Sequence, residues 1–190
     1  MIKAVIFDFF GVLVTEGFKL FCDTYFPDDK ARRSQALELV RSHDAGRISK
    51  AQYVTGLATL AGVSEKVVHD HMSGNQPNQT LLSYIKNELK LKYKVGILSN
   101  SGDNYVTQIL NPEDVKLFDD VILSYRYGVT KPQAELFELA ARRLGVLAQD
   151  CVFIDDASRY CDAAKAVGMK AIWYRDFPQM KLELEKILAA

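Results

Sequence analysis

Five short runs of apolar residues constrain the fold of this 190-residue chain more than any other feature. They occupy residues 4–7, 95–98, 121–123, 151–154 and 171–174. None alternates between apolar and polar side chains, and continuous apolar runs of this length are typical of strands buried on both faces. The sequence therefore predicts a parallel sheet with helices packed on both sides.

Helical patterns between these runs support the same class of fold. Apolar residues recur at helical spacing over residues 81–89, 106–110, 134–144 and 163–167. Pro132 is placed at the first turn of the third of these helices, and Gly145 ends it. Strands that alternate with helices predict an α/β fold, here a three-layer, Rossmann-like core around a parallel five-stranded sheet.

Residues 15–78 interrupt the alternation of strands and helices. This stretch has no strand-like run, but it contains helix signals, including a possible capping box at Ser49 and Gln52 and a stop at Gly62. We expect an inserted helical unit over residues 15–78, and a core formed by residues 1–14 and 79–190.

Composition excludes several classes of partner. The 24 basic and 24 acidic residues cancel, whereas a nucleic-acid binder usually has a basic excess. No uninterrupted apolar run approaches the roughly 18 residues of a membrane span. The three cysteines form no C-x-x-C pair, which favours free thiols in a reducing compartment. The N-terminus does not resemble a signal peptide, so we expect a cytoplasmic protein.

Polar residues follow three of the predicted strands directly. Asp8 ends the first run, Ser99 and Asn100 end the second, and Asp155 and Asp156 end the fourth. Ligands of open parallel sheets bind beyond the carboxyl ends of the strands, so these side chains are expected to converge on one site. The alternative interpretation is that they only begin loops or cap helices.

These segments resemble the four motifs of the haloacid dehalogenase-like superfamily, in the same order along the chain. They are residues 7–13 (FDFFGVL), 97–100 (ILSN), 127–132 (YGVTKP) and 153–156 (FIDD). Residues 43–49 (HDAGRIS) are similar to a segment of the small helical cap carried by subfamily I. The resemblance implies a capped Rossmann-like fold with strand order 5-4-1-2-3.

The resemblance also implies a Mg²⁺-dependent, phosphatase-like hydrolase that acts on a small phosphorylated metabolite. Asp8 would attack phosphorus and become an acyl phosphate. Asp8, the main-chain carbonyl of Phe10 and Asp156 would bind Mg²⁺, with Asp155 behind them or acting through water. Ser99, Asn100 and Lys131 would bind the phosphate, and Ser99 and Lys131 would also assist catalysis. The resemblance leaves the identity of the substrate and the oligomeric state open.

Phe10 departs from the family pattern. Family phosphatases usually carry there a second Asp, which protonates the leaving group and then activates water. General acid–base catalysis contributes roughly 10²–10⁴ in rate, so Phe10 predicts weak turnover unless another group replaces the acid. Tyr160 also departs, because relatives often have Asn or Asp at its position. Two alternatives therefore stay open: a dehalogenase that hydrolyses carbon–halogen bonds, and a catalytically weak protein that binds phosphorylated ligands.

Several other residues receive only structural interpretations from the sequence. His43, His69 and His71 are interpreted as surface residues of the insertion. Trp173 is expected in the core because it ends a predicted strand. Arg47 could face a phosphate or a sugar, or lie at a solvated helix end.

Overall fold

The structure, a computed structural model, describes residues 1–189, and the sheet in this part of the chain has five parallel strands. The strands are β1 (Ala4–Phe7), β2 (Lys94–Ser99), β3 (Asp120–Leu123), β4 (Cys151–Asp155) and β5 (Lys170–Trp173). Their order is β3-β2-β1-β4-β5, which is the predicted order read from the other edge. Each apolar run of the sequence therefore forms a strand, with bounds that shift by at most one residue.

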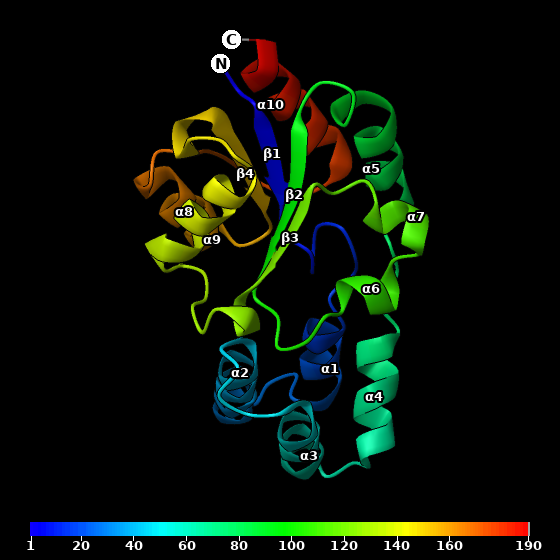
Figure 1. Cartoon of the computed structure of the whole chain (residues 1–190). Coiled ribbons are helices and arrows are strands. Elements are labelled where there is room, and N and C mark those ends of the chain that lie inside the picture. The colour runs from blue at the N-terminus through cyan, green and yellow to red at the C-terminus, as the bar shows by residue number, and fades with distance from the viewer. Residues whose placement is uncertain (190) are drawn as a thin grey trace.

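Helices cover both faces of the sheet (Figure 1). One face packs against α5 (Gln79–Tyr84), its continuation as a π-helical turn (Ile85–Leu89), and α10 (Phe177–Ala189). The other face packs against α8 (Ala134–Arg143) and α9 (Ser158–Ala166). Shorter elements at the edges are α6 (Val106–Ile109), α7 (Pro112–Val115), and 3₁₀ turns at Ser124–Arg126 and Ala148–Asp150.

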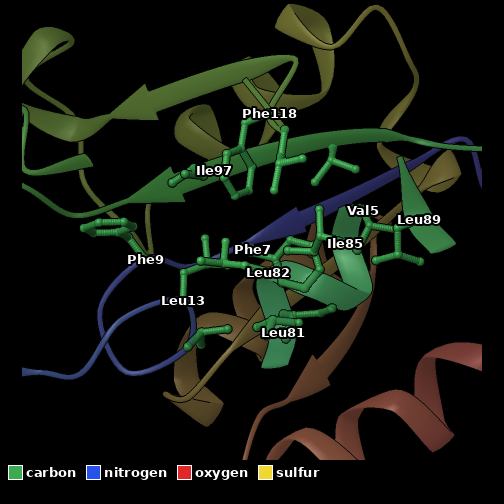
Figure 2. Packing of buried hydrophobic residues seen from close by; sticks show 14 of the residues in the cluster. Val5, Phe7, Phe9, Leu13, Leu81, Leu82, Ile85, Leu89, Ile97 and Phe118 are labelled. Carbon is green, nitrogen blue, oxygen red and sulfur yellow. The ribbon is translucent and has the colours of Figure 1, made fainter. Parts of the chain in front are cut away.

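Alternate residues of each strand contribute to the two layers of the core. Val5 and Phe7 of β1 are fully buried on the α5 side, where Figure 2 shows them beside Leu82 and Ile85. Their neighbours in β1 lie in the cluster that contains α8 and α9. Burial of both sets explains why the strand is continuously apolar. Asp8, the next residue, is the first polar side chain that this strand offers.

An inserted helical unit separates β1 from α5 and lies beyond the carboxyl ends of the strands, opposite both termini (Figure 1). It consists of α1 (Gly17–Tyr25), α2 (Lys30–Asp44), α3 (Lys50–Ala61) and α4 (Glu65–Ser73). We call these four helices the cap. They have an apolar core of their own, which includes Phe21, Phe26 and Leu57. The predicted capping box of Ser49 and Gln52 begins α3.

The sequence interpretation of two residues outside the cap was wrong. Pro132 does not enter the first turn of α8, because Thr130 and Gln133 close a turn around it through a main-chain hydrogen bond of 2.8 Å. Trp173 is not in the core: 51% of its surface is exposed, since β5 is an edge strand.

His43 and His71 of the cap were also misinterpreted. His43 is 3% exposed and stacks on Tyr53, with the ring centroids 4.8 Å apart. His71 is half-buried against the rings of Phe21 and Tyr25. Among residues 1–189, no helix combines the length and the apolar character needed to cross a lipid bilayer.

Candidate active site

The carboxyl ends of the three central strands bring the predicted polar residues together. Asp8 follows β1, which pairs with β2 on one side and with β4 on the other. Asp155 is the last residue of β4 and Asp156 follows it. One carboxylate oxygen from each of Asp8, Asp155 and Asp156 lies within 4.8 Å of the others. The loop interpretation of these residues therefore does not account for their arrangement.

Lys131 lies between two of these carboxylates, those of Asp8 and Asp155. Its Nζ is 2.8 Å from Asp8 Oδ1 and 2.6 Å from Asp155 Oδ2, and its side chain is 1% exposed. Burial acts to lower the pKa of Lys131, but the charges of Asp155 and Asp8 outweigh it and raise the pKa above its usual value. The lysine is therefore a fixed cation at the base of the site.

The surroundings of Asp8 disfavour the negatively charged form of its carboxyl group. The Phe9 N–H donates to its Oδ1 at 2.7 Å, and Lys131 supports the same oxygen. Burial and the charge of Asp155 nevertheless raise the pKa of Asp8 well above its ordinary value, and Asp156 adds to this effect. One lysine does not balance three carboxylates, so the cluster has an excess of negative charge that a cation would offset.

Asp155 and Asp156 are not equivalent. Both oxygens of Asp155 are engaged, Oδ2 by Lys131 and Oδ1 by the Ala157 N–H at 2.8 Å. Asp156 instead lines the cavity described below. A Cβ built at Gly11 would lie 2.3 Å from Asp156 Oδ2, so the missing side chain at Gly11, where φ is +82°, makes the space for this carboxylate. Asp156 is thus the carboxylate whose oxygens face the cavity and can bind a cation, and Mg²⁺ prefers hard oxygen ligands of this kind.

The side-chain amide of Asn100 holds the main chain of Lys131 through two hydrogen bonds. The Lys131 N–H donates to Asn100 Oδ1 at 2.7 Å, and Asn100 Nδ2 donates to the Lys131 carbonyl at 3.1 Å. Ser99 is 1% exposed, and its hydroxyl donates to the Asn100 carbonyl at 3.3 Å. Asn100 lines the cavity, and Ser99 precedes Asn100 as the last residue of β2. The structure therefore brings the second and third motifs together at the same point.

A cavity of about 600 Å³ lies between the core and the cap above the carboxylates. Asp8, Asp156 and Lys131 form part of its wall on the core side. The cap supplies polar and aromatic residues, which include Arg41, Asp44, Arg47 and Tyr53. Arg47 is thus at the wall of the site. A space of this size suits a small molecule.

Phe10 is part of the same wall. Its ring makes edge contacts with Phe9 and Tyr105, with ring centroids 5.0 and 5.8 Å apart. Tyr160 also lines the cavity, and its hydroxyl accepts a hydrogen bond from Asn100 Nδ2 at 3.3 Å. Both departures from the family pattern therefore face the place where a ligand would bind, and neither of them supplies a carboxyl group.

Two acidic residues that the sequence did not single out also line this cavity. Glu16 directly precedes α1, and burial together with the charge of Asp156 raises its pKa. Asp44 is the last residue of α2, and burial raises its pKa to about 7. Asp44 lies in the segment 43–49 that resembles the family's cap, but this resemblance gives it no role, and no motif contains Glu16. Helix periodicity does not show which side of the insertion faces the core.

The three cysteines are free and buried, as expected. Burial raises the pKa of Cys22 to about 11 and the pKa values of Cys151 and Cys161 to about 12. The thiolate is the reactive form of cysteine, so these side chains do not offer a nucleophile near neutral pH.

A carboxylate cluster at the centre of a parallel sheet, with an inserted helical cap above it, defines a capped α/β fold with a polar ligand site. The chain belongs to the haloacid dehalogenase-like hydrolase family, which matches residues 2–168. The predicted membership of this family and the predicted fold class are therefore confirmed.

Curated relatives include phosphatases. D-ribitol-5-phosphate phosphatase of Bacteroides thetaiotaomicron is 25% identical over 205 residues, which cover 99% of each chain. Glyceraldehyde 3-phosphate phosphatase of Pyrococcus abyssi is 37% identical over 91 residues, which cover 45% of this chain and 37% of that enzyme.

Solved structures share the fold. A haloacid dehalogenase family enzyme of Bacteroides thetaiotaomicron, in complex with magnesium and inorganic phosphate, has a TM-score of 0.73 and 24% identity, and the match covers 95% of this chain and 99% of that one. L-2-haloacid dehalogenase of Xanthobacter autotrophicus has a TM-score of 0.66 and 22% identity, and the match covers 90% of this chain and 76% of that one. The fold is thus common to proteins with different chemistry.

Proposed function

We propose that this protein is a Mg²⁺-dependent phosphatase that hydrolyses a small phosphorylated metabolite through an aspartyl phosphate at Asp8. The observation that carries the proposal is the cluster of Asp8, Asp155 and Asp156, in which Lys131 pairs with Asp8 and Asp155, and from which Asp8, Asp156 and Lys131 line the cavity. The relatives that act on ribitol 5-phosphate and glyceraldehyde 3-phosphate support a substrate of that size.

Each residue has a distinct part in this proposal. Asp8 attacks phosphorus, while Lys131 and the polar groups of Ser99 and Asn100 hold the phosphate oxygens. Asp8, Asp156 and the Phe10 carbonyl hold Mg²⁺, and Asp155 positions Lys131. When bound, Mg²⁺ reduces the repulsion between the carboxylate nucleophile and the dianionic phosphate.

The remaining sequence predictions belong to the same proposal. Residues 1–14 and 79–190 form the catalytic core, and residues 15–78 form a cap that selects the substrate. The ligand is a small molecule and not a nucleic acid, in line with the zero net charge. The free thiols favour a reducing compartment such as the cytoplasm.

The test is a screen of phosphorylated metabolites and of 4-nitrophenyl phosphate, each with Mg²⁺ and with a chelator. We expect phosphate release only with Mg²⁺. Phe10, an aromatic residue beside the nucleophile, favours a haloacid dehalogenase as the second candidate, and 2-haloacids are therefore assayed in parallel. Halide release that is independent of Mg²⁺, with no phosphate release, would establish the second candidate instead. Binding of phosphorylated compounds without turnover would contradict both.

Asp156→Asn tests the metal site. The substitution removes the charge of this cavity-facing carboxylate, and we expect Mg²⁺ affinity to fall by about 100-fold or more, since even indirect contacts to a metal can be worth 10–100-fold. Isothermal titration calorimetry measures the affinity. Asp162→Asn, an exposed residue of α9 that pairs with Lys165, is the control and should bind Mg²⁺ as the wild type does. Equal affinity in both variants would remove Asp156 from the metal site.

A further inference from the structure

Phe10 leaves the proposed reaction without a proton donor at the position where the family has one. An alkyl phosphate needs such a donor, because an alkoxide is a poor leaving group. If the proposed function holds, on which this inference rests, another residue of the chain must supply the proton. The donor must lie at the cavity, must not be engaged by other groups, and must exchange its proton near neutral pH.

Asp44 lies at the cavity wall and is fixed there by contacts between the cap and the core. Its main-chain carbonyl accepts a hydrogen bond of 2.5 Å from the Ser124 hydroxyl. The ring of His43, the preceding residue, lies so close to Gly102 that a Cβ there would be 2.3 Å from it. The end of α2 therefore rests on core loops and keeps Asp44 at the same cavity as Asp8.

The carboxyl group of Asp44 is not engaged by protein groups. Within residues 1–189, it has no hydrogen bond and no ion pair, in contrast to Asp155, whose two oxygens are both engaged. Burial raises the pKa of Asp44 to about 7; attraction by Lys131 opposes this effect, and repulsion by Glu16 adds to it. Both the acid and the carboxylate form are therefore present near neutral pH.

Other titratable groups at the cavity are less suited to the role of proton donor. Burial lowers the pKa of His43, and its two ring nitrogens contact the Ile48 carbonyl and the Tyr105 hydroxyl at 3.3 and 3.4 Å. Burial raises the pKa values of Tyr53 and Tyr105 well above neutral.

The remaining charged groups on the cap side are Arg41, Arg47 and Glu16. Arg41 and Arg47 carry guanidinium groups, which suit binding of a phosphate rather than proton transfer. Burial is the largest effect on the pKa of both acids. Next in size, the charge of the metal-site carboxylate Asp156 raises the pKa of Glu16, whereas the charge of Lys131, the cation paired with Asp8, lowers the pKa of Asp44.

We propose that Asp44, a residue of the cap, is the general acid and base that Phe10 cannot be. In the first step Asp8 Oδ bonds to phosphorus, the bond from phosphorus to the leaving oxygen breaks, and the Asp44 proton moves to that oxygen. In the second step the Asp44 carboxylate takes a proton from water, whose oxygen bonds to phosphorus as the bond to Asp8 breaks. Phosphate leaves, and both residues return to their starting forms.

The test compares leaving groups in the full-length protein with saturating Mg²⁺. The value of kcat/KM reports the first step, so we expect Asp44→Asn to lower it by about 10²–10⁴ for alkyl phosphates such as glycerol 3-phosphate. For 4-nitrophenyl phosphate, whose leaving group 4-nitrophenolate departs without a proton, we expect kcat/KM to change less than tenfold (about 1.4 kcal/mol). A burst of 4-nitrophenol should then appear, because the second step lacks its base.

The pH profile gives a second readout. A donor works in its protonated form, which is lost as the pH rises through its pKa, so wild-type kcat/KM for the alkyl phosphate should fall above about pH 7. The profile of 4-nitrophenyl phosphate should lack this decline, and the decline should be absent in Asp44→Asn. Asp44→Glu, which retains an acid, should recover part of the alkyl activity.

Glu16→Gln is the matched variant from the same cavity and should keep the wild-type ratio of alkyl to aryl activity. A selective loss of alkyl activity in Glu16→Gln, but not in Asp44→Asn, would overturn the assignment. An equal loss for both substrates in a folded Asp44→Asn would show a merely structural role and would also overturn it. Wild-type turnover of aryl but not alkyl phosphates would contradict this inference and leave the proposed function intact. Turnover of neither would contradict both.

Discussion

Asp8→Asn is expected to abolish phosphate release. The substitution keeps the shape of the side chain but removes the charge that attacks phosphorus. Loss of a hydrolase nucleophile costs up to about 10⁶ in rate, so we expect turnover of 4-nitrophenyl phosphate to fall at least 10⁴-fold. An aryl phosphate is the substrate of choice because its leaving group needs no proton in the first step.

The fold of Asp8→Asn should survive, as circular dichroism and thermal melting would show. Asp70→Asn, an exposed residue of α4 paired with Lys66, is the control and should keep full activity. Turnover retained by Asp8→Asn, in a preparation free of other phosphatases, would remove Asp8 from the mechanism.

Lys131→Met is expected to destabilise the fold strongly. The lysine is buried between Asp8 and Asp155, and methionine of similar length would leave two carboxylates without their cation. Breaking a buried ion pair by removing one partner costs about 3–5 kcal/mol, and we expect a loss of this size in the free energy of unfolding from denaturant titration.

Two variants test whether unpaired charge causes the loss of stability in Lys131→Met. Lys66→Met removes an exposed lysine paired with Asp70, and the expected change is below about 1 kcal/mol. Adding Asp155→Asn to Lys131→Met removes the charge of one of the two carboxylates that have lost their cation, so the double variant should be more stable than Lys131→Met alone. If the double variant were no more stable than Lys131→Met, unpaired charge would not be the cause of the lost stability, and the lost contacts of Lys131 with Phe153 and Tyr160 would account for it.

The strands were predictable because strong local signals determine them. Strands covered on both faces must be apolar throughout, and the polar residues that follow must lie at one edge of the sheet. Asp8 and Asp156 could therefore be placed at one site from the sequence. The family resemblance added Lys131 and the strand order, which local pattern alone does not specify.

The cap side of the site could not be predicted in the same way. Helix α2 is polar around most of its circumference, so periodicity does not reveal that its last residues rest on Gly102 and Ser124. His43 is buried only because α2 meets both α3 and the core there. Asp44 owes its raised pKa to the same contact. Such properties arise from the packing of distant segments and leave no local pattern in the sequence.

Trp173 gives the site a spectroscopic reporter. It is the only tryptophan of the chain, about half of its surface is exposed, and its indole N–H donates to the Asp156 carbonyl at 2.8 Å. All indole fluorescence therefore comes from one position, one hydrogen bond away from the residue proposed to bind metal. Emission intensity and wavelength can follow cation binding in the unlabelled protein, and stopped-flow mixing can time it against each step of turnover.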